Sequence, residues 1–188
     1  MNDTIRDKQT QLTKEIIVNS FLDLVEEKSG LNIKITDVCK RAEISRGTFY
    51  NHFIDIDDLI DYINSWYVET LRPHLVYLFD IEKPDELVSI GILRQFMGLL
   101  SKHPKYCSVI LCTEHGKCAM KKVQDVFQEQ YKSWLQKFHP EIDVDRALYS
   151  LAAASGGGLN VLRKWIIGGF RETPEEMLRY FPRLKDIQ

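Results

Sequence analysis

The segment TDVCKRAEISRGTFYNHF, residues 36–53, predicts two short helices joined by a tight turn. Thr36 is a suitable N-cap for the first helix, because its hydroxyl can accept a hydrogen bond from a backbone N–H of the first turn. Glu43 lies where the chain must turn, and Ser45 can cap a second helix that begins at Arg46. We therefore expect a helix-turn-helix unit over these residues.

The second of these helices combines one apolar face with an otherwise polar surface. Phe49 and Phe53 are four residues apart, so they lie on the same helix face and can anchor it to a core. A short helix that is apolar beneath and rich in donors above fits the major groove of DNA. Polar residues on a short helix are more often only a solvated face, so the residues alone leave both interpretations open. The donor-bearing residues are Arg46, Thr48, Tyr50, Asn51 and His52.

The same segment resembles the N-terminal domain of the tetracycline-repressor (TetR) family of bacterial transcription regulators. The resemblance begins at KEIIVNSFLDLVEE, residues 14–27, passes through residues 36–53 and continues into DIDDLIDYI, residues 55–63, in the order that the family has. The SRGTFYNHF block, residues 45–53, is more specific than a general helix-turn-helix pattern. Near the other end, GGGLNVLRKWIIGGFRETPEEML, residues 156–178, resembles the last two helices of one large TetR subgroup.

The resemblance implies roles for individual residues of the helix pair. It implies that Thr36 contacts a phosphate and that Arg46 or Thr48 reads base edges. Tyr50 and His52 would hold phosphates, which positions the protein without reading the sequence. Gly47 would permit close approach of the backbone, and Lys40 would add diffuse charge. The predicted DNA-contacting residues are therefore Thr36, Lys40, Arg46, Gly47, Thr48, Tyr50, Asn51 and His52.

Two positions depart from the family pattern. Family members usually have glycine where this chain has Glu43, so we expect mild strain or a different geometry in the turn. They also often have a phosphate-contacting lysine at the start of the fourth helix, where this chain has Ile56 between acidic residues. The second departure supports a rival hypothesis, in which the protein is a co-regulator of the same fold that does not bind DNA and acts by protein–protein interaction.

The composition of the 188 residues is that of an ordinary globular protein, with 44% hydrophobic residues, 28% charged residues and a net charge of −2. Residues 1–53 contain eight lysines and arginines against eight aspartates and glutamates, so this part is neutral. The polar N-terminus predicts no signal peptide, and no apolar stretch is long enough for a membrane span, so the four cysteines favour a reducing, cytoplasmic location. DNA affinity must then come from a local arrangement of cations, which are Arg6, Lys8, Lys14, Lys40, Arg41 and Arg46.

Apolar residues at helical spacing recur along almost the whole chain, without β-type alternation of useful length. We expect an all-α protein of about nine helices. A three-helix DNA-binding domain would occupy residues 1–55, and a ligand-binding and dimerisation bundle residues 56–188. Asp55 can cap the fourth helix, another helix is expected over about residues 119–138, and TPEE at 173–176 predicts the start of the last one.

Residues 156–158 are three consecutive glycines inside a predicted helix, and each costs about 0.5–1 kcal/mol relative to alanine. Close approach of another helix, room for a small molecule, or a local kink without a role would each account for them. Two recognition helices about 34–36 Å apart reach successive half-sites, so DNA binding predicts a homodimer and an inverted-repeat operator. The predicted dimer interface, from the family resemblance, consists of Leu148, Leu151, Ser155, Gly158, Leu159, Leu162, Met177 and Phe181.

An aromatic-rich set on the middle helices is the candidate pocket for an unknown small-molecule effector. Residues at these spacings are more often plain core, although aromatic residues with polar tips line many ligand pockets. A ligand changes DNA affinity only if it favours one separation of the two N-terminal domains, and the fourth helix is the element that touches both units. The candidate set is Phe96, Leu100, Ile110, Phe127, Tyr131, Trp134 and Tyr149.

A second cluster, His103, Cys107, Cys112, His115 and Cys118, suggests a soft-metal or redox site. Its spacing matches no common zinc motif, so buried or incidental cysteines are the default, and no metal or cofactor is expected. The sequence has no Gly-rich phosphate loop, nucleophile elbow or convincing acid–base pair, so no enzymatic activity is predicted. The expected function is a ligand-responsive repressor that binds DNA as a homodimer.

Overall fold

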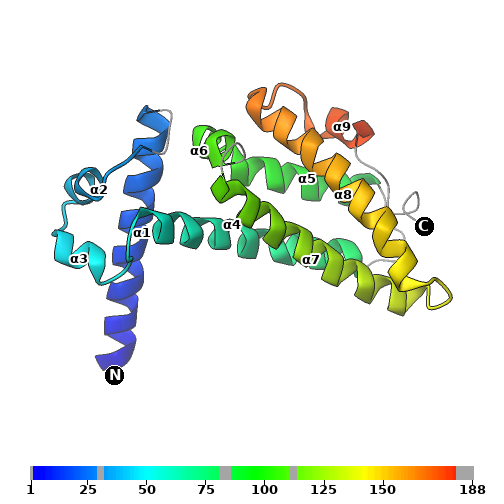
Figure 1. Ribbon diagram of the computed structural model, residues 1–188, viewed down its shortest axis with the longest axis horizontal. Coiled ribbons are helices and arrows are strands. Elements are labelled where there is room, and N and C mark those ends of the chain that lie inside the picture. The colour runs from blue at the N-terminus through cyan, green and yellow to red at the C-terminus, as the bar shows by residue number, and fades with distance from the viewer. Residues whose placement is uncertain (1, 29–31, 81–85, 111–113, 181–188) are drawn as a thin grey trace.

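The structure is a computed structural model that describes residues 2–28, 32–80, 86–110 and 114–180. Over this part of the chain all regular structure is helical, which confirms the predicted all-α class. Figure 1 shows α1, α2 and α3 at one end of the molecule and α4 leading away from them into a bundle with the later helices. The helices are α1 (Asn2–Lys28), α2 (Ile35–Arg41), α3 (Arg46–Tyr50), α4 (Ile56–Phe79), α5 (Glu86–Leu100), α6 (Pro104–Ile110), α7 (Glu114–Phe138), α8 (Val144–Ile167), α9 (Pro174–Met177) and the 3-10 helix η1 (Leu178–Tyr180). The described helices include no candidate for a bilayer-spanning segment.

The first three helices pack around one apolar core. Ile17, Phe21 and Val25 recur on one face of α1 and are fully buried, as their helical spacing predicts. Phe49 of α3 and Phe53, which follows it, belong to the same cluster and are also buried. Burying a side chain of this size stabilises a fold by about 1.5–3 kcal/mol, so this core holds α3 firmly against α1.

α4 begins in this core and ends in another. Asp55 caps its first turn, because its carboxylate accepts a hydrogen bond from the N–H of Asp58 at 2.8 Å, as the sequence predicts. At the other end Phe79 joins a second apolar cluster with Tyr131 and Trp134 of α7 and with residues of α8. α7 packs along α4 (Figure 1), so the bundle is built on the same helix that follows α3.

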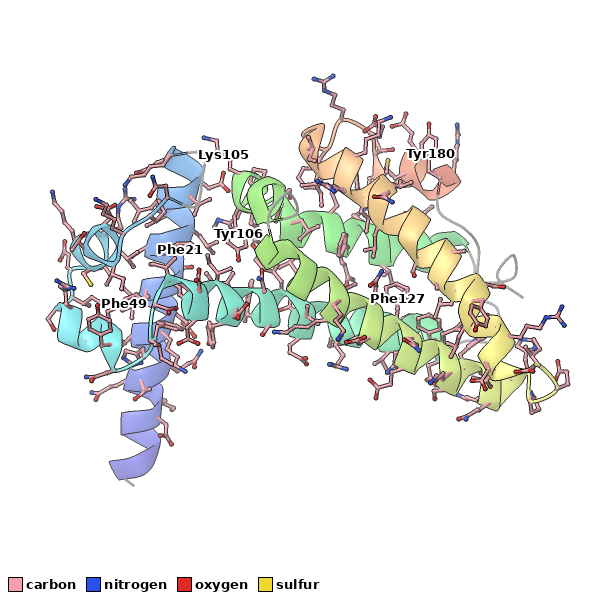
Figure 2. All side chains as sticks on the ribbon, viewed as in Figure 1. Phe21, Phe49, Lys105, Tyr106, Phe127 and Tyr180 are labelled. Atoms are coloured by element: carbon pink, nitrogen blue, oxygen red, sulfur yellow. The ribbon has the colours of Figure 1, made fainter. Side chains whose placement is uncertain are left out.

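Polar contacts tie α6 to both α1 and α4. The Glu26 carboxylate of α1 accepts hydrogen bonds from the backbone N–H groups of Lys105 at 2.9 Å and Tyr106 at 3.0 Å, in the first turn of α6. The Tyr106 hydroxyl is 3.1 Å from Asn64 Oδ1 of α4, to which it donates, and both side chains are buried. Figure 2 shows Tyr106 lying between α1 and the bundle. Movement of α6 would therefore disturb contacts with the N-terminal unit.

The start of α2 differs from the predicted one. α2 begins at Ile35 with Lys34 as its N-cap residue, so Thr36 lies inside the first turn and is not the cap. The carboxylate of Asp37, at the third helical position, accepts a hydrogen bond from the N–H of Lys34 at 3.3 Å. This contact from within the helix replaces the side-chain cap that a threonine would have supplied.

α7 also starts earlier than predicted, at Glu114 instead of near residue 119. The predicted start lies after Gly116, a residue that costs about 1 kcal/mol inside a helix, yet the helix continues through it. The last helix starts as predicted. The Thr173 N–H donates to Glu176 Oε2 at 2.8 Å, and Thr173 Oγ1 accepts from the Glu176 N–H at 3.3 Å, which makes a capping box.

Candidate nucleic-acid interface

The turn between α2 and α3 sets the direction in which α3 is presented. α2 ends at the C-cap residue Ala42, and Glu43 then adopts a φ of 53°, in the left-handed region that favours glycine. The N–H of Ile44 donates to the carbonyl of Cys39 at 3.0 Å, which is a hydrogen bond of the Schellman motif. The chain thus makes a glycine-type turn with a glutamate, and the strain expected from the sequence is present.

α3 is only five residues long, and Ser45 holds its N-terminus. Ser45 Oγ accepts a hydrogen bond from the N–H of Thr48 at 3.0 Å, and the two hydroxyls lie 2.9 Å apart. On the inner face Phe49 is fully buried (Figure 2), with its ring centroid 5.9 Å from that of Phe53. The cap and the two rings fix the helix, so its other faces are presented in one orientation.

Arg46 and Tyr50 lie one helical turn apart on the exposed side of α3. An Arg46 Nη atom donates to the Tyr50 hydroxyl at 3.3 Å, and the guanidinium carbon lies 6.0 Å from the centroid of the tyrosine ring. The Tyr50 side chain is 49% exposed, so its hydroxyl is accessible to another molecule. A guanidinium at this place can bind a guanine edge through two parallel hydrogen bonds.

The structure brings all eight predicted contact residues to the surface of the helix pair. Thr36 and Lys40 lie on α2, and the others lie on α3 or directly after it. Thr48 and His52 are half-buried and the other six are exposed. A Cβ added at Gly47 would meet only Ser45 Oγ, at 3.6 Å, so the fold itself does not need glycine there. The lack of a side chain at Gly47 instead allows an external molecule to approach the backbone closely.

His52 has an unusual environment for a surface residue. Its Nδ1 atom is buried without a hydrogen-bond partner. Burial, and secondarily the positive charge of Lys14, lowers the pKa of the imidazole below its ordinary value. The ring is therefore neutral at neutral pH, and a phosphate placed beside it would favour the protonated form.

Ion pairs engage two of the cations in the N-terminal unit. Lys28 Nζ lies 2.8 Å from an Asp37 carboxylate oxygen, and Arg41 lies 2.5 Å from a Glu27 oxygen. Arg41, one of the cations from which DNA affinity is expected to come, is thus directed at α1. Lys40 is exposed and forms no ion pair within the described part of the chain.

Three residues outside the predicted sites connect the helix-turn-helix to the rest of the chain, namely Glu26, Asn64 and Tyr106. A signal for one of them exists in the sequence. Asn64 falls at helical spacing between Ile60 and Tyr67, where the apolar face of α4 would otherwise be continuous. A polar residue at such a position needs a hydrogen-bond partner, which here comes from α6.

The predicted pocket residues do not lie together. Phe96 and Leu100 pack against the apolar core of the first three helices, and Tyr149 is 81% exposed on α8. The side chain of Ile110 falls outside the described residues. Three of the predicted residues lie together in the second apolar cluster, namely Phe127, Tyr131 and Trp134. Figure 2 labels Phe127. The effector pocket stays a prediction.

The described part of the cysteine and histidine cluster gives no sign of a reactive site. Cys107 is buried, its Sγ lies 3.5 Å from the Leu100 carbonyl oxygen, and burial raises the pKa of the thiol to about 12. Such a thiol carries almost no thiolate at neutral pH. No group of three or more His, Cys, Asp or Glu side chains suited to a metal ion occurs in the described part of the chain. Of the remaining members, His103 is half-buried at the start of α6, and nothing is described of Cys112 or of the side chains of His115 and Cys118.

The apolar face of α8 points into its own chain. The predicted interface residues on α8 are half-buried or buried, Met177 is 4% exposed, and Phe181 lies outside the described residues. An added Cβ at Gly156 or Gly157 would meet no atom within 4 Å, so packing within the chain does not require these glycines. The exposed side of α8 instead carries Tyr149, Ala152, Ala153, Gly157 and Asn160.

Among curated proteins, the sequence similarity is confined to a short segment. No family model matches the chain. The HTH-type dhaKLM operon transcriptional activator DhaS of Lactococcus lactis is 34% identical over 56 residues. This match covers 30% of this chain and 30% of the length of that relative.

Solved structures match nearly the whole chain. A TetR-family transcriptional regulator from Syntrophomonas wolfei gives a TM-score of 0.64 at 21% identity, over 90% of each chain. A TetR/AcrR-family transcriptional regulator from Aquifex aeolicus gives a TM-score of 0.58 at 26% identity, over 89% of this chain and 95% of the other. The helix-turn-helix and the bundle that follows it therefore form one known arrangement.

Proposed function

We propose that this member of the TetR family of transcriptional regulators binds operator DNA by placing α3 in the major groove. One observation carries the proposal. Buried Phe49 and Phe53 fix α3 from beneath, while Arg46 and Tyr50 are exposed and Thr48 is half-buried on the same short helix. A helix needs both features, because its position must be rigid and its outer donors must reach base edges and phosphates.

Within this interface the residues divide by task. Arg46 and Thr48, at the start of α3, are proposed to read base edges. Tyr50 and His52 are proposed to bind phosphates, together with Thr36 on α2. Arg46 shares a hydrogen bond with Tyr50 in the free protein, and this bond must be exchanged for contacts to DNA when the guanidinium turns toward a base.

We further propose that the protein acts as a homodimer on an inverted repeat. One five-residue recognition helix reads too little DNA for useful specificity, whereas two reach successive half-sites about 34–36 Å apart. The exposed side of α8 offers a surface for the second copy, because Gly156 and Gly157 leave open space beside the helix. A partner helix can approach such a surface closely.

Regulation by a small molecule, with repression as the basal state, completes the proposal. A ligand in the bundle must favour one arrangement of the N-terminal unit to change DNA affinity. α4 reaches from the core beneath α3 to the second cluster, and α6 contacts it through Tyr106 and Asn64. These helices are the route by which we propose that the two ends communicate. A regulator of this kind acts where the genome is, which we propose is the cytoplasm.

The test is a gel shift on the duplex upstream of the protein's own gene, measured as salt is raised from about 50 to 200 mM. The intact protein should bind and lose affinity steeply with salt. Arg46→Ala should reduce discrimination between sequences by about 1–3 kcal/mol, whereas Tyr50→Phe should weaken binding to all sequences. Lys132→Ala, which removes an exposed lysine of α7, is the matched control and should leave binding unchanged. Binding that is unaffected by both interface changes would refute these assignments.

The rival function, a co-regulator that acts through another protein, has one observation in its favour. The N-terminal unit carries no excess positive charge, and Lys28 and Arg41 are engaged by carboxylates. In that case the intact protein would show no DNA binding even at low salt, and Arg46→Ala would have no effect on the regulated gene.

A further inference from the structure

The junction between α3 and α4 carries negative charge close to the place where we propose that DNA approaches. Asp55, Asp57 and Asp58 surround Ile56 at the start of α4. The carboxylate of Asp55 caps the helix, which satisfies its hydrogen bonding but does not remove its charge. A phosphate bound beside His52 therefore requires a cation nearby to offset this repulsion.

Lys14 of α1 lies at this junction. Its Nζ is 5.1 Å from the ring centroid of Tyr62 on α4 and 6.0 Å from that of Phe53. The two rings contact each other edge to face, with centroids 5.4 Å apart, so the ammonium is held against a pair of aromatic side chains. The side chain is half-buried, and its alkyl stem is ordered by these contacts.

The charge of Lys14 is not neutralised by a neighbour. Within the described part of the chain it forms no ion pair with a carboxylate, in contrast to Lys28 with Asp37 and Arg41 with Glu27. A lysine held by aromatic rings keeps its full charge and its N–H donors, whereas a paired one must first give up its partner. Lys14 is thus ready to bind an external anion.

We infer that Lys14 binds a DNA phosphate beside His52 and anchors the C-terminal end of α3 on the backbone. The inference rests on the proposed function. Lys14 Nζ lies 6.0 Å from the ring centroid of Phe53, the residue after His52, so Lys14 lies at the end of α3 that carries His52, and its charge acts on the His52 ring. Arg46 and Thr48 occupy the other end of α3, so Lys14 positions the helix and does not read bases.

The test compares Lys14→Met, which keeps an apolar stem against the rings, with Lys14→Arg, which keeps the charge. Affinity is measured between about 50 and 200 mM salt on the duplex upstream of the gene and on a random-sequence duplex of equal length. Lys14→Met should weaken binding to both duplexes by about 5-fold per lost contact at 0.15 M salt, or about 30-fold for two subunits, and should lower the salt slope by about 0.9 per contact. Lys14→Arg should retain both quantities.

Lys132→Met is the matched control, because it removes an exposed lysine of α7 in the bundle and should have little effect. Removing the charge of Lys14 also raises the pKa of His52, which alone would strengthen phosphate binding, so a loss of affinity is not an indirect effect of the histidine. If intact protein binds DNA and Lys14→Met leaves its salt slope unchanged, the inference is overturned. If intact protein does not bind at all, the proposed function fails instead. Should Lys14→Met not fold, Lys14→Gln gives the same comparison.

Discussion

The backbone of Glu43 adopts a conformation that favours glycine. It follows α2 with a φ of 53°, and an L-residue in the left-handed region carries a cost of about 1–2 kcal/mol. Glycine avoids this cost but loses more conformational entropy on folding. We therefore predict that Glu43→Gly raises the free energy of unfolding by about 0.5–1 kcal/mol, or the melting temperature by about 1–4 °C for a chain of this size.

Urea and thermal unfolding of the two proteins would measure this gain. Glu43→Ala is the informative control, because it removes the same carboxylate but keeps a Cβ in the left-handed region. A gain from Glu43→Ala equal to that from Glu43→Gly would show that charge, and not backbone strain, limits stability at this turn.

The C-terminal ends of α2 and α8 have the same turn geometry but place different residues in it. The end of α8 has Gly169 at a φ of 80°, and the N–H of Phe170 donates to the Trp165 carbonyl at 3.0 Å. Gly168-Gly169 predicts this end from residue type alone. The matching end of α2 has Glu43, so only the resemblance to a family pattern indicated a turn of this geometry there. Residue preferences predict an element boundary well where the residue suits its conformation, and poorly where it is strained.

Ser45 allows the stability of α3 to be separated from its contact with DNA. Its hydroxyl caps the helix through the Thr48 N–H, so Ser45→Ala should cost about 1 kcal/mol of unfolding free energy. Ser45→Asp should keep the cap and the stability, because aspartate is an equally good N-cap, but should weaken DNA binding by placing a negative charge in the interface.

Chemical unfolding and the gel shift would be run side by side on both variants. Ser133→Ala, an exposed serine within α7, is the control and should change neither quantity by more than about 0.5 kcal/mol. Equal DNA affinity of Ser45→Asp and the intact protein would place α3 away from the phosphate backbone and contradict the proposed docking.

At the scale of the whole molecule, the sequence predicts which residues are apolar but not what they pack against. The sequence predicts the helix-turn-helix closely, except for the start of α2, because turn and core positions lie within a few residues of one another. The apolar face of α8 was assigned to a partner subunit, yet Leu151 is buried in the chain's own second cluster. Periodicity cannot distinguish these cases, since burial against another helix looks the same within one chain and between two. The contact of Glu26 with α6 depends on residues about eighty positions apart and leaves no local pattern.

Gly156 and Gly157 provide the sharpest test of whether a second copy packs on α8. In an isolated subunit, alanine at either position meets open space and should stabilise the helix by about 0.5–1 kcal/mol. If a second helix lies against these glycines, the added methyl groups force it away, at a cost of about 1–3 kcal/mol, or about 5- to 150-fold in the dimer dissociation constant. The two effects have opposite signs, so sedimentation velocity over a range of protein concentrations, combined with thermal melts, separates them. Gly98→Ala on α5 is the control, because its Cβ also meets open space and should add helix stability without changing self-association. Unchanged association of both α8 variants would exclude close packing at this face and place the dimer contact elsewhere on the bundle.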